Sequence, residues 1–374
     1  MEICYPDYDE SLLSLTASVL RHYGAETGHK SLPELDDLLA KKPKNVVILL
    51  FDGMGPSLLA QHLPEDSFLR RHVARTLSSV FPPTTTAATT TMESGLSPIE
   101  HGWLGWSLFF EELGANIDIF PNTLTENNTV KAADYNVAHR YTPYKTIFEK
   151  IEAATGGAVQ AFCVSPFSVF SRHKAKSAEE TCRIVADLCR EPGGRYIFAY
   201  WPQPDSSEHK LGTGHPDITA LLQDIDHQVE ALCAELTDSL VIVTADHGLT
   251  DNTTLLLADY PDIMDCLVRN PSLEARALSF FIKSGRCGDF EKAFAAHFAE
   301  HYKLFTHQEV MDLALFGPGT PHPRSWGFIG DYLAVATGTV TLIPDGCPTH
   351  PAAHAGFTAL ERDIPFIVVD KTGR

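Results

Sequence analysis

The chain has 374 residues, and its 48 acidic side chains outnumber its 29 lysines and arginines, which gives a formal net charge of −19. Apolar residues make up 44% and charged residues 21%, a composition that excludes an intrinsically disordered chain. The acidic balance argues against non-specific binding to nucleic acid or to an anionic membrane, because both need a basic field. The net charge does not exclude an anionic substrate, because bound metal ions can reverse the local charge.

Two helices are predicted at the start of the chain. Apolar residues recur at helical spacing from Glu10 to Tyr23, after Asp9 as a candidate N-cap. Ser31 to Glu34 has the pattern of a capping box with proline in the first turn, and it is expected to open a helix through Leu39. We expect this N-terminal helical segment, residues 1–40, to pack on the core.

Short apolar runs rich in β-branched residues indicate buried strands. The first, Asn45 to Phe51, is apolar on both faces, as parallel strands in the middle of a sheet are. Helical patterns separate several of these runs, which predicts a doubly wound, mostly parallel α/β sheet with helices on both faces. The later runs are Ala158 to Val164, Tyr196 to Trp201, Ser239 to Thr244, Tyr332 to Ala336 and Ile364 to Val369.

One stretch breaks the alternation and predicts a small inserted α+β subdomain, residues 255–324. Within it, Arg276 to Ile282 is typical of a strand and Phe290 to Tyr302 of a helix, and a second strand and helix follow. The glycine- and proline-rich segment Gly317 to Pro323 then ends the insertion. The segment Trp103 to Tyr144 has weak periodicity and is expected to pass over the sheet edge as a second excursion.

Four polar clusters lie next to the apolar runs. In open α/β sheets the ligand site lies at the carboxyl ends of strands, so these clusters are expected to converge in space. They hold aspartate and histidine side chains, the oxygen and nitrogen donors that zinc or manganese takes. Six such ligands are enough for two ions that keep open positions for substrate. The candidates are Asp52, Asp205, His209, Asp246, His247 and His354, with His350 as the alternative to His354.

A threonine-rich block follows at Phe81 to Gly95. Six threonines in the eight positions from Thr84 to Thr91 are unusual for a helix interior, where β-branched residues are mildly unfavourable. One interpretation is a helix N-terminus capped by Thr84 or Thr85. The other is a hydroxyl nucleophile at a helix start, where backbone N–H groups and the helix dipole favour an anion such as phosphate.

These features, in this order along the chain, resemble the alkaline phosphatase superfamily, and most closely its type I nucleotide pyrophosphatase/phosphodiesterase branch. The resemblance extends from about Asn45 to Val369. Its most specific parts are Asp52, the segment Ser94 to Gly102, Asp205 with His209, Asp246 to Gly248, and His354 to Gly356.

The resemblance implies a hydrolase with two divalent ions, zinc or alternatively manganese, in a catalytic core made of residues 41–254 and 325–374. It implies one ion held by Asp205, His209 and His354, and a second held by Asp52, Asp246 and His247. His354 is preferred over His350 because only His354 has the family's following glycine.

The resemblance also places the nucleophile. When the residues are counted back from Ser94-Gly95, the position of the family's nucleophile falls on Thr85, and Thr84 and Thr86 are the alternatives. Its oxygen would be a further metal ligand, and attack on phosphorus would form a covalent phosphothreonine that water then cleaves.

Two departures from the family bear on the substrate. The phosphodiesterase branch places an asparagine shortly after the pair that matches His101-Gly102, but here the chain continues Trp103-Leu104-Gly105-Trp106. In addition, no arginine can be assigned to the role of clamping a monoester, as in classical alkaline phosphatases. Trp103 and Trp106 are candidates to stack on a base or an aromatic leaving group, or else pack under the excursion. We expect hydrolysis of phosphodiester or pyrophosphate bonds. The alternatives are a phosphomonoesterase, a phosphonate hydrolase, and an inactive metal-binding relative.

Location and partners complete these expectations. No stretch approaches the roughly 18 apolar residues of a membrane span. The segment Met1 to Asp9 lacks a basic region followed by an apolar stretch, and the eight cysteines form no CxxC pair. We expect a cytoplasmic protein that binds a small phosphate ester or nucleotide, without a nucleic-acid or membrane partner.

Overall fold

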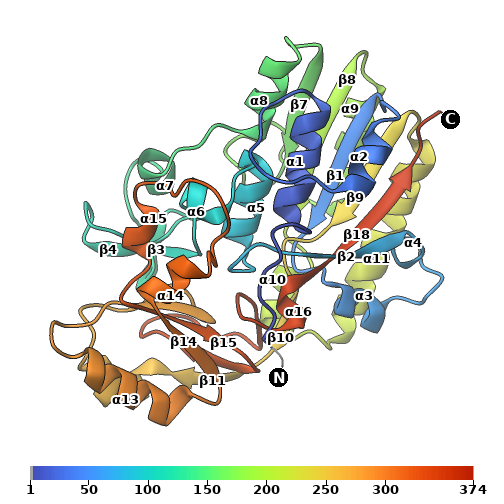
Figure 1. Cartoon of the computed structure of the whole chain (residues 1–374). Helices are drawn as coiled ribbons and strands as arrows, with labels where there is room; N and C mark the ends of the chain where they lie inside the picture. The colour runs from blue at the N-terminus through green and yellow to red at the C-terminus, as the bar shows by residue number, and fades with distance from the viewer. Residues whose placement is uncertain (1–2, 374) are drawn as a thin grey trace.

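The computed structural model describes residues 3–373 and is built around a central six-stranded sheet (Figure 1). The innermost strand, β1, runs parallel to both of its neighbours, β8 and β9, and β7 continues the parallel part beyond β8. The strand β18 pairs antiparallel with β9 and β2. The order is β2 (Val73–Ser78), β18 (Asp363–Asp370), β9 (Ser239–Thr244), β1 (Asn45–Phe51), β8 (Gly194–Trp201) and β7 (Val159–Val164).

Helices cover this sheet in two groups, so the predicted α/β architecture is confirmed (Figure 1). Every residue of β1 and β9 is buried, as expected of strands covered on both faces. The members of each group contact one another. One group is α1 (Leu12–His22), α2 (Pro33–Leu39), α5 (Thr85–Ser94) and α8 (Ile147–Ala154). The other is α3 (Pro56–His62), α4 (Phe68–Arg71), α9 (Ala178–Arg190) and α11 (Pro216–Glu235).

The starts of the first two helices differ from the prediction. The N-cap of α1 is Ser11, whose hydroxyl accepts a hydrogen bond from Leu13 N, and not Asp9. The N-cap of α2 is Leu32 without a side-chain cap, because the Ser31 hydroxyl donates to Asp36 Oδ2 instead. Proline in the first turn of α2 is as predicted.

A second, eight-stranded sheet of antiparallel neighbours lies beside the first (Figure 1). Phe290, Phe294 and Phe298 on α13 (Cys287–Phe298) pack on it at helical spacing. The strand order is β14 (Tyr302–Thr306), β15 (Tyr332–Ala336), β13 (Ala277–Phe280), β12 (Ser272–Glu274), β3 (Ser107–Phe110), β4 (Ala115–Asp118), β5 (Thr123–Leu124) and β6 (Asn127–Lys131).

This second sheet corrects one strand assignment. Tyr332–Ala336 is a buried strand as expected, but it pairs with β13 and β14 and not with the central sheet. Strands from the excursion, 103–144, join the same sheet through the pairing of β3 with β12. The sheet therefore uses strands outside the segment 255–324, whose limits as a subdomain stay a prediction.

Short elements make the remaining connections. They are α6 (Pro98–His101), α7 (Val137–Tyr141), α10 (Asp205–Leu211), β10 (Thr250–Asp251), β11 (Thr253–Leu256), η1 (Leu257–Asp259), α12 (Pro261–Met264), α14 (His307–Asp312), α15 (Ser325–Phe328), β16 (Val340–Ile343), β17 (Ala352–Ala353) and α16 (Ala359–Arg362). Within residues 3–373, none of the helices combines the length and the apolar character that crossing a membrane requires.

Candidate metal centre and active site

The polar clusters converge because three neighbouring parallel strands end together. In the register of the sheet, Phe51 at the end of β1 lies opposite Trp201 at the end of β8, and Leu50 lies opposite Thr244 at the end of β9. The chain then turns sharply at Gly53, which has φ 75° and leaves no room for a side chain, because a Cβ there would lie 2.9 Å from Asp205 Cβ. The carboxyl ends of the strands thus deliver three of the predicted ligand clusters to one place.

The first group of candidate ligands consists of Asp52, Asp246 and His247, all buried, with ligand atoms within 4.8 Å of one another. His247 Nε2 lies 3.3 Å from Asp52 Oδ1 and 3.6 Å from Asp246 Oδ2. Asp246 Oδ1 accepts hydrogen bonds from Gly53 N and His247 N, whereas Oδ2 is buried and has no hydrogen-bond partner among residues 3–373. An orphaned carboxylate oxygen at the centre of such a group fits a cation ligand.

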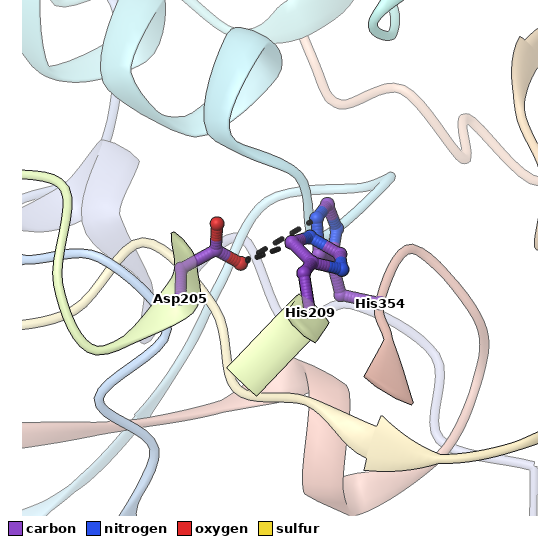
Figure 2. A group of neighbouring side chains, drawn as sticks. All are labelled: Asp205, His209 and His354. Carbon is purple, nitrogen blue, oxygen red and sulfur yellow. Dashed lines mark ion pairs between the residues drawn. The ribbon is translucent and has the colours of Figure 1, made fainter. Parts of the chain in front are cut away.

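The second group consists of Asp205 and His209, both on α10, and His354 from the segment after β17, and the three side chains point toward one another (Figure 2). His209 Nε2 lies 3.2 Å and His354 Nε2 3.9 Å from Asp205 Oδ1, a buried oxygen that forms no hydrogen bond within the part of the chain that the structure describes. The opposite ring nitrogens face backbone carbonyls, His209 Nδ1 that of Ala352 at 2.8 Å and His354 Nδ1 that of Pro83 at 3.1 Å. Such bonds fix the ring orientation and leave Nε2 for an ion.

The rival histidine lies nearby but outside the group. The ring of His350 is centred 4.9 Å from that of His209, yet His350 is not among the residues that gather around Asp205. His354 instead stacks on His247 with ring centroids 3.8 Å apart, which places it between the two groups. The geometry thus favours His354, as the resemblance to the family did.

The crowded carboxylates of the centre also favour the binding of positive ions. Burial raises the pKa of Asp52 well above its ordinary value, and the nearby charges of Asp246 and Asp205 raise it further. Burial likewise raises the pKa of Asp246. Burial would also raise the pKa of Asp205, but the charges of His209 and His354 outweigh it and lower that pKa. Three crowded carboxylates with histidine nitrogens are a donor set that suits two divalent cations.

Titration of metal-free protein with zinc is expected to reach two ions per chain, because two separate groups of three ligands are present. The melting temperature should rise with zinc, since a ligand that binds only the folded state stabilises it by mass action. Elemental analysis and thermal unfolding measure both effects. His354→Ala should lose one ion while His350→Ala keeps two; equal stoichiometry in both variants would contradict the assignment.

Of the three neighbouring threonines, only Thr85 is directed at the first group. Thr85 begins α5, and its Oγ1 lies 3.4 Å from Asp52 Oδ2 and 3.3 Å from His247 Nε2. Thr84 points away and donates to Glu274 Oε1 at 2.6 Å. Thr86 Oγ1 is buried without a partner in the part of the chain that the structure describes. Thr84 occupies the N-cap position of α5, as one interpretation of the sequence suggested, but within the described residues its side chain makes no capping hydrogen bond.

Two residues at this centre had no signal in the sequence. The Tyr200 hydroxyl donates to Asp52 Oδ2 from within β8. Glu274, from the second sheet, accepts from both Thr84 Oγ1 and Trp106 N, and burial raises its pKa to about 7. Neither residue stands in a motif. Tyr200 lies on β8 beside Leu50 of β1, and Glu274 reaches this region through the packing of the second sheet.

The two candidate tryptophans differ in their surroundings. Trp103 is 2% exposed, donates from Nε1 to Thr142 O and lines a pocket. Trp106 is 37% exposed and is not among the residues that line this pocket, although its ring lies 6.0 Å from that of Phe120, which does line it. Trp103 therefore both packs under the excursion and borders a cavity.

Comparison with known proteins shows the family and the fold of the chain. Residues 46–279 match the family described as type I phosphodiesterase/nucleotide pyrophosphatase, whereas no curated protein matches the chain. A similar fold is found in murine ectonucleotide pyrophosphatase/phosphodiesterase 5, with 17% identity, a TM-score of 0.63, and coverage of 86% of this chain and 87% of the other. The phosphonoacetate hydrolase of Sinorhizobium meliloti 1021, in complex with phosphonoformate, shows 16% identity, a TM-score of 0.62 and coverage of 87% and 90%.

The matched region spans more than half of the chain and contains Asp52, Thr85, Asp205 and Asp246. The family is a branch of the alkaline phosphatase superfamily, and the central sheet and helices agree with it. The chain belongs to the type I phosphodiesterase/nucleotide pyrophosphatase family and is a phosphoric ester hydrolase.

Proposed function

We propose that this chain hydrolyses phosphodiester or pyrophosphate bonds of a small organic phosphate, with Thr85 as the nucleophile and two divalent ions, preferably zinc, as cofactors. The observation that carries the proposal is the position of Thr85 Oγ1, 3.3 to 3.5 Å from ligand atoms of Asp52 and His247. A hydroxyl beside a carboxylate and an imidazole in a buried, cation-binding centre is arranged for activation.

Each group of residues has its own role in the proposed reaction. When bound, divalent ions supply Lewis-acid stabilisation of the charge on the entering and leaving oxygens. Thr85 Oγ1 forms a bond to phosphorus while the bond from phosphorus to the leaving oxygen breaks, and water later cleaves the phosphothreonine. The six side chains of the two groups hold the ions, and Tyr200 orients Asp52 through its hydroxyl.

The start of α5 offers a place for the phosphate oxygens. No side chain caps this helix, because Thr84 is bonded to Glu274. Its first backbone N–H groups are therefore available to an anion, and the helix dipole favours negative charge there. In this proposal, these backbone N–H groups bind the phosphate oxygen that the family binds with an asparagine after the pair matching His101-Gly102.

A diester is expected to be the better substrate than a monoester. Within the described residues, the carboxylates of the centre form ion pairs with histidines but with no lysine or arginine, and the buried Arg276 is engaged by Glu361. A monoester dianion carries one more charge, which sites usually meet with a positioned cation. The Glu274 carboxyl beside Thr84 adds negative character when it ionises.

The measurement compares kcat/KM for bis-p-nitrophenyl phosphate and p-nitrophenyl phosphate on one zinc-loaded preparation, with phosphonoacetate as a third substrate. We expect the diester to exceed the monoester at least tenfold, roughly 1.4 kcal/mol in transition-state stabilisation. A tenfold preference for the monoester would establish a phosphomonoesterase instead. Turnover of phosphonoacetate alone would establish a phosphonate hydrolase.

A further inference from the structure

The residue before the candidate nucleophile has the position and the backbone conformation of a helix cap. Thr84 is the N-cap of α5, and its φ of −144° and ψ of 149° are the extended angles that N-cap residues adopt. Threonine is also one of the residue types that cap helices through a side-chain oxygen. Within residues 3–373, however, the Thr84 hydroxyl makes no capping hydrogen bond. The backbone is therefore prepared for a cap that the side chain does not make.

Glu274 binds the Thr84 hydroxyl instead. The hydroxyl donates to Glu274 Oε1 at 2.6 Å, and the same carboxyl oxygen accepts a hydrogen bond from Trp106 N at 2.7 Å. Glu274 is the last residue of β12, in the second sheet, 190 positions after Thr84 along the chain. Because a side chain occupies one rotamer at a time, a hydroxyl that is directed at Glu274 is directed away from the start of the helix.

Three backbone N–H groups at the start of α5 have no partner in the part of the chain that the structure describes. They belong to Thr85, Thr86 and Ala87, and the first hydrogen bond along the helix is made by the N–H of the next residue. These three residues are at most 6% exposed, so water has little access to them. Thr86 Oγ1 is likewise buried and unpaired among residues 3–373. Unpaired buried donors are costly, so their presence beside the candidate metal ligands points to an anion that binds there.

The segment that leads into the nucleophile is fixed at two successive residues. Pro83 O faces His354 Nδ1 at 3.1 Å, and the hydroxyl of Thr84 donates to Glu274. Of these two anchors, only Glu274 lies outside the candidate ligand groups. A change at Glu274 therefore frees the Thr84 hydroxyl and retains every candidate ligand side chain.

We propose that Glu274 is a positioning residue that keeps the Thr84 hydroxyl away from the start of α5 and so leaves N–H groups there open to a phosphate oxygen. An N-cap side chain bonds the N–H of the second or third helical residue, which in α5 are Thr86 and Ala87. A hydroxyl that capped the helix would occupy a donor that the phosphate needs. This inference rests on the proposed function, because Thr85 places the phosphorus at this end of the helix.

The direction of the Thr84 side chain tests the first step without metal or substrate. In Glu274→Leu the acceptor is gone, so the Thr84 hydroxyl should turn and accept a hydrogen bond from the N–H of Thr86 or Ala87. In Glu274→Gln the amide oxygen still accepts, so the hydroxyl should keep its present direction. A crystal structure of each variant measures both results. A hydroxyl that stays away from both N–H groups in Glu274→Leu overturns the proposal.

Binding of inorganic phosphate to the zinc-loaded chain tests the consequence. Glu274→Leu should weaken the affinity measured by calorimetry at least tenfold, because a hydrogen bond to a charged group is lost. Thr84→Val removes the hydroxyl that would form the cap, so Glu274→Leu/Thr84→Val should return to within threefold of the wild type. Glu274→Gln and Thr84→Val alone should bind as the wild type does. The control Glu274→Leu/Thr86→Val keeps the Thr84 hydroxyl and should remain as weak as Glu274→Leu.

Rescue by the second change distinguishes positioning from a purely structural role. If Glu274 only supported the packing of the two sheets, loss of the Thr84 hydroxyl would restore nothing. The inference is overturned if the double variant with Thr84→Val stays as weak as Glu274→Leu, or if the wild type binds no phosphate. A tenfold loss in Glu274→Gln or in Thr84→Val overturns it as well, and these two variants decide the matter if Glu274→Leu does not fold. A wild-type chain that shows the expected binding pattern but hydrolyses no diester overturns only the proposed function.

Discussion

Replacement of Thr85 by alanine is expected to reduce kcat for a diester by several orders of magnitude while zinc still binds at two ions per chain. The hydroxyl lies 3.3 Å from His247 Nε2, and alanine leaves no atom there to attack phosphorus. All six candidate ligand side chains are retained in this variant, and Asp52 keeps its hydrogen bond from the Tyr200 hydroxyl. Steady-state kinetics and elemental analysis of the same preparation measure the two results.

The neighbouring threonines supply matched controls. Thr84→Val removes a hydroxyl that bonds Glu274, and Thr86→Val removes one that is buried without a partner among residues 3–373. Both variants should lose far less activity than Thr85→Ala. The assignment is wrong if Thr85→Ala keeps a rate near that of the wild type, or if a trapped phosphoryl group maps to another threonine.

Replacement of Arg276 by methionine is expected to destabilise the fold by about 3–5 kcal/mol, the usual cost of leaving one member of a buried ion pair alone. Arg276 and Glu361 are both fully buried, and the arginine contacts the carboxylate through Nε at 2.6 Å and Nη2 at 2.9 Å. Glu361 also accepts from Gly356 N, two residues after His354. Its carbonyl accepts from Gly248 N, next to His247.

The pair therefore supports the backbone beside one ligand of each metal group. Gly248 leaves no room for a side chain, since a Cβ there would lie 2.2 Å from Leu360 O. We expect Arg276→Met to weaken zinc binding in addition to lowering the midpoint of urea unfolding. The double variant with Glu361→Leu removes both charges and should regain stability relative to Arg276→Met alone. A double variant less stable than the single one would show that the isolated charge is not the cause.

The sequence by itself determined most of the central strands and which six candidate ligand side chains meet. The strands β1 and β9 begin and end at the predicted residues, because a continuous run of β-branched and apolar side chains is a local property of the chain. The six candidate ligands gather as expected, because parallel strands place their carboxyl ends at one edge of a sheet. The resemblance to the family singled out Thr85 as the candidate nucleophile, with Thr84 and Thr86 as rivals.

Only the tertiary structure decided what surrounds these residues. A buried strand has the same pattern in either sheet, so Tyr332–Ala336 could not be assigned to the second sheet from its sequence. Tyr200 and Glu274 stand in no motif and come within hydrogen-bond distance of the centre through long-range packing. The pocket beside Trp103 combines side chains from distant segments, and such a cavity exists only once helix, sheet and loop are packed together.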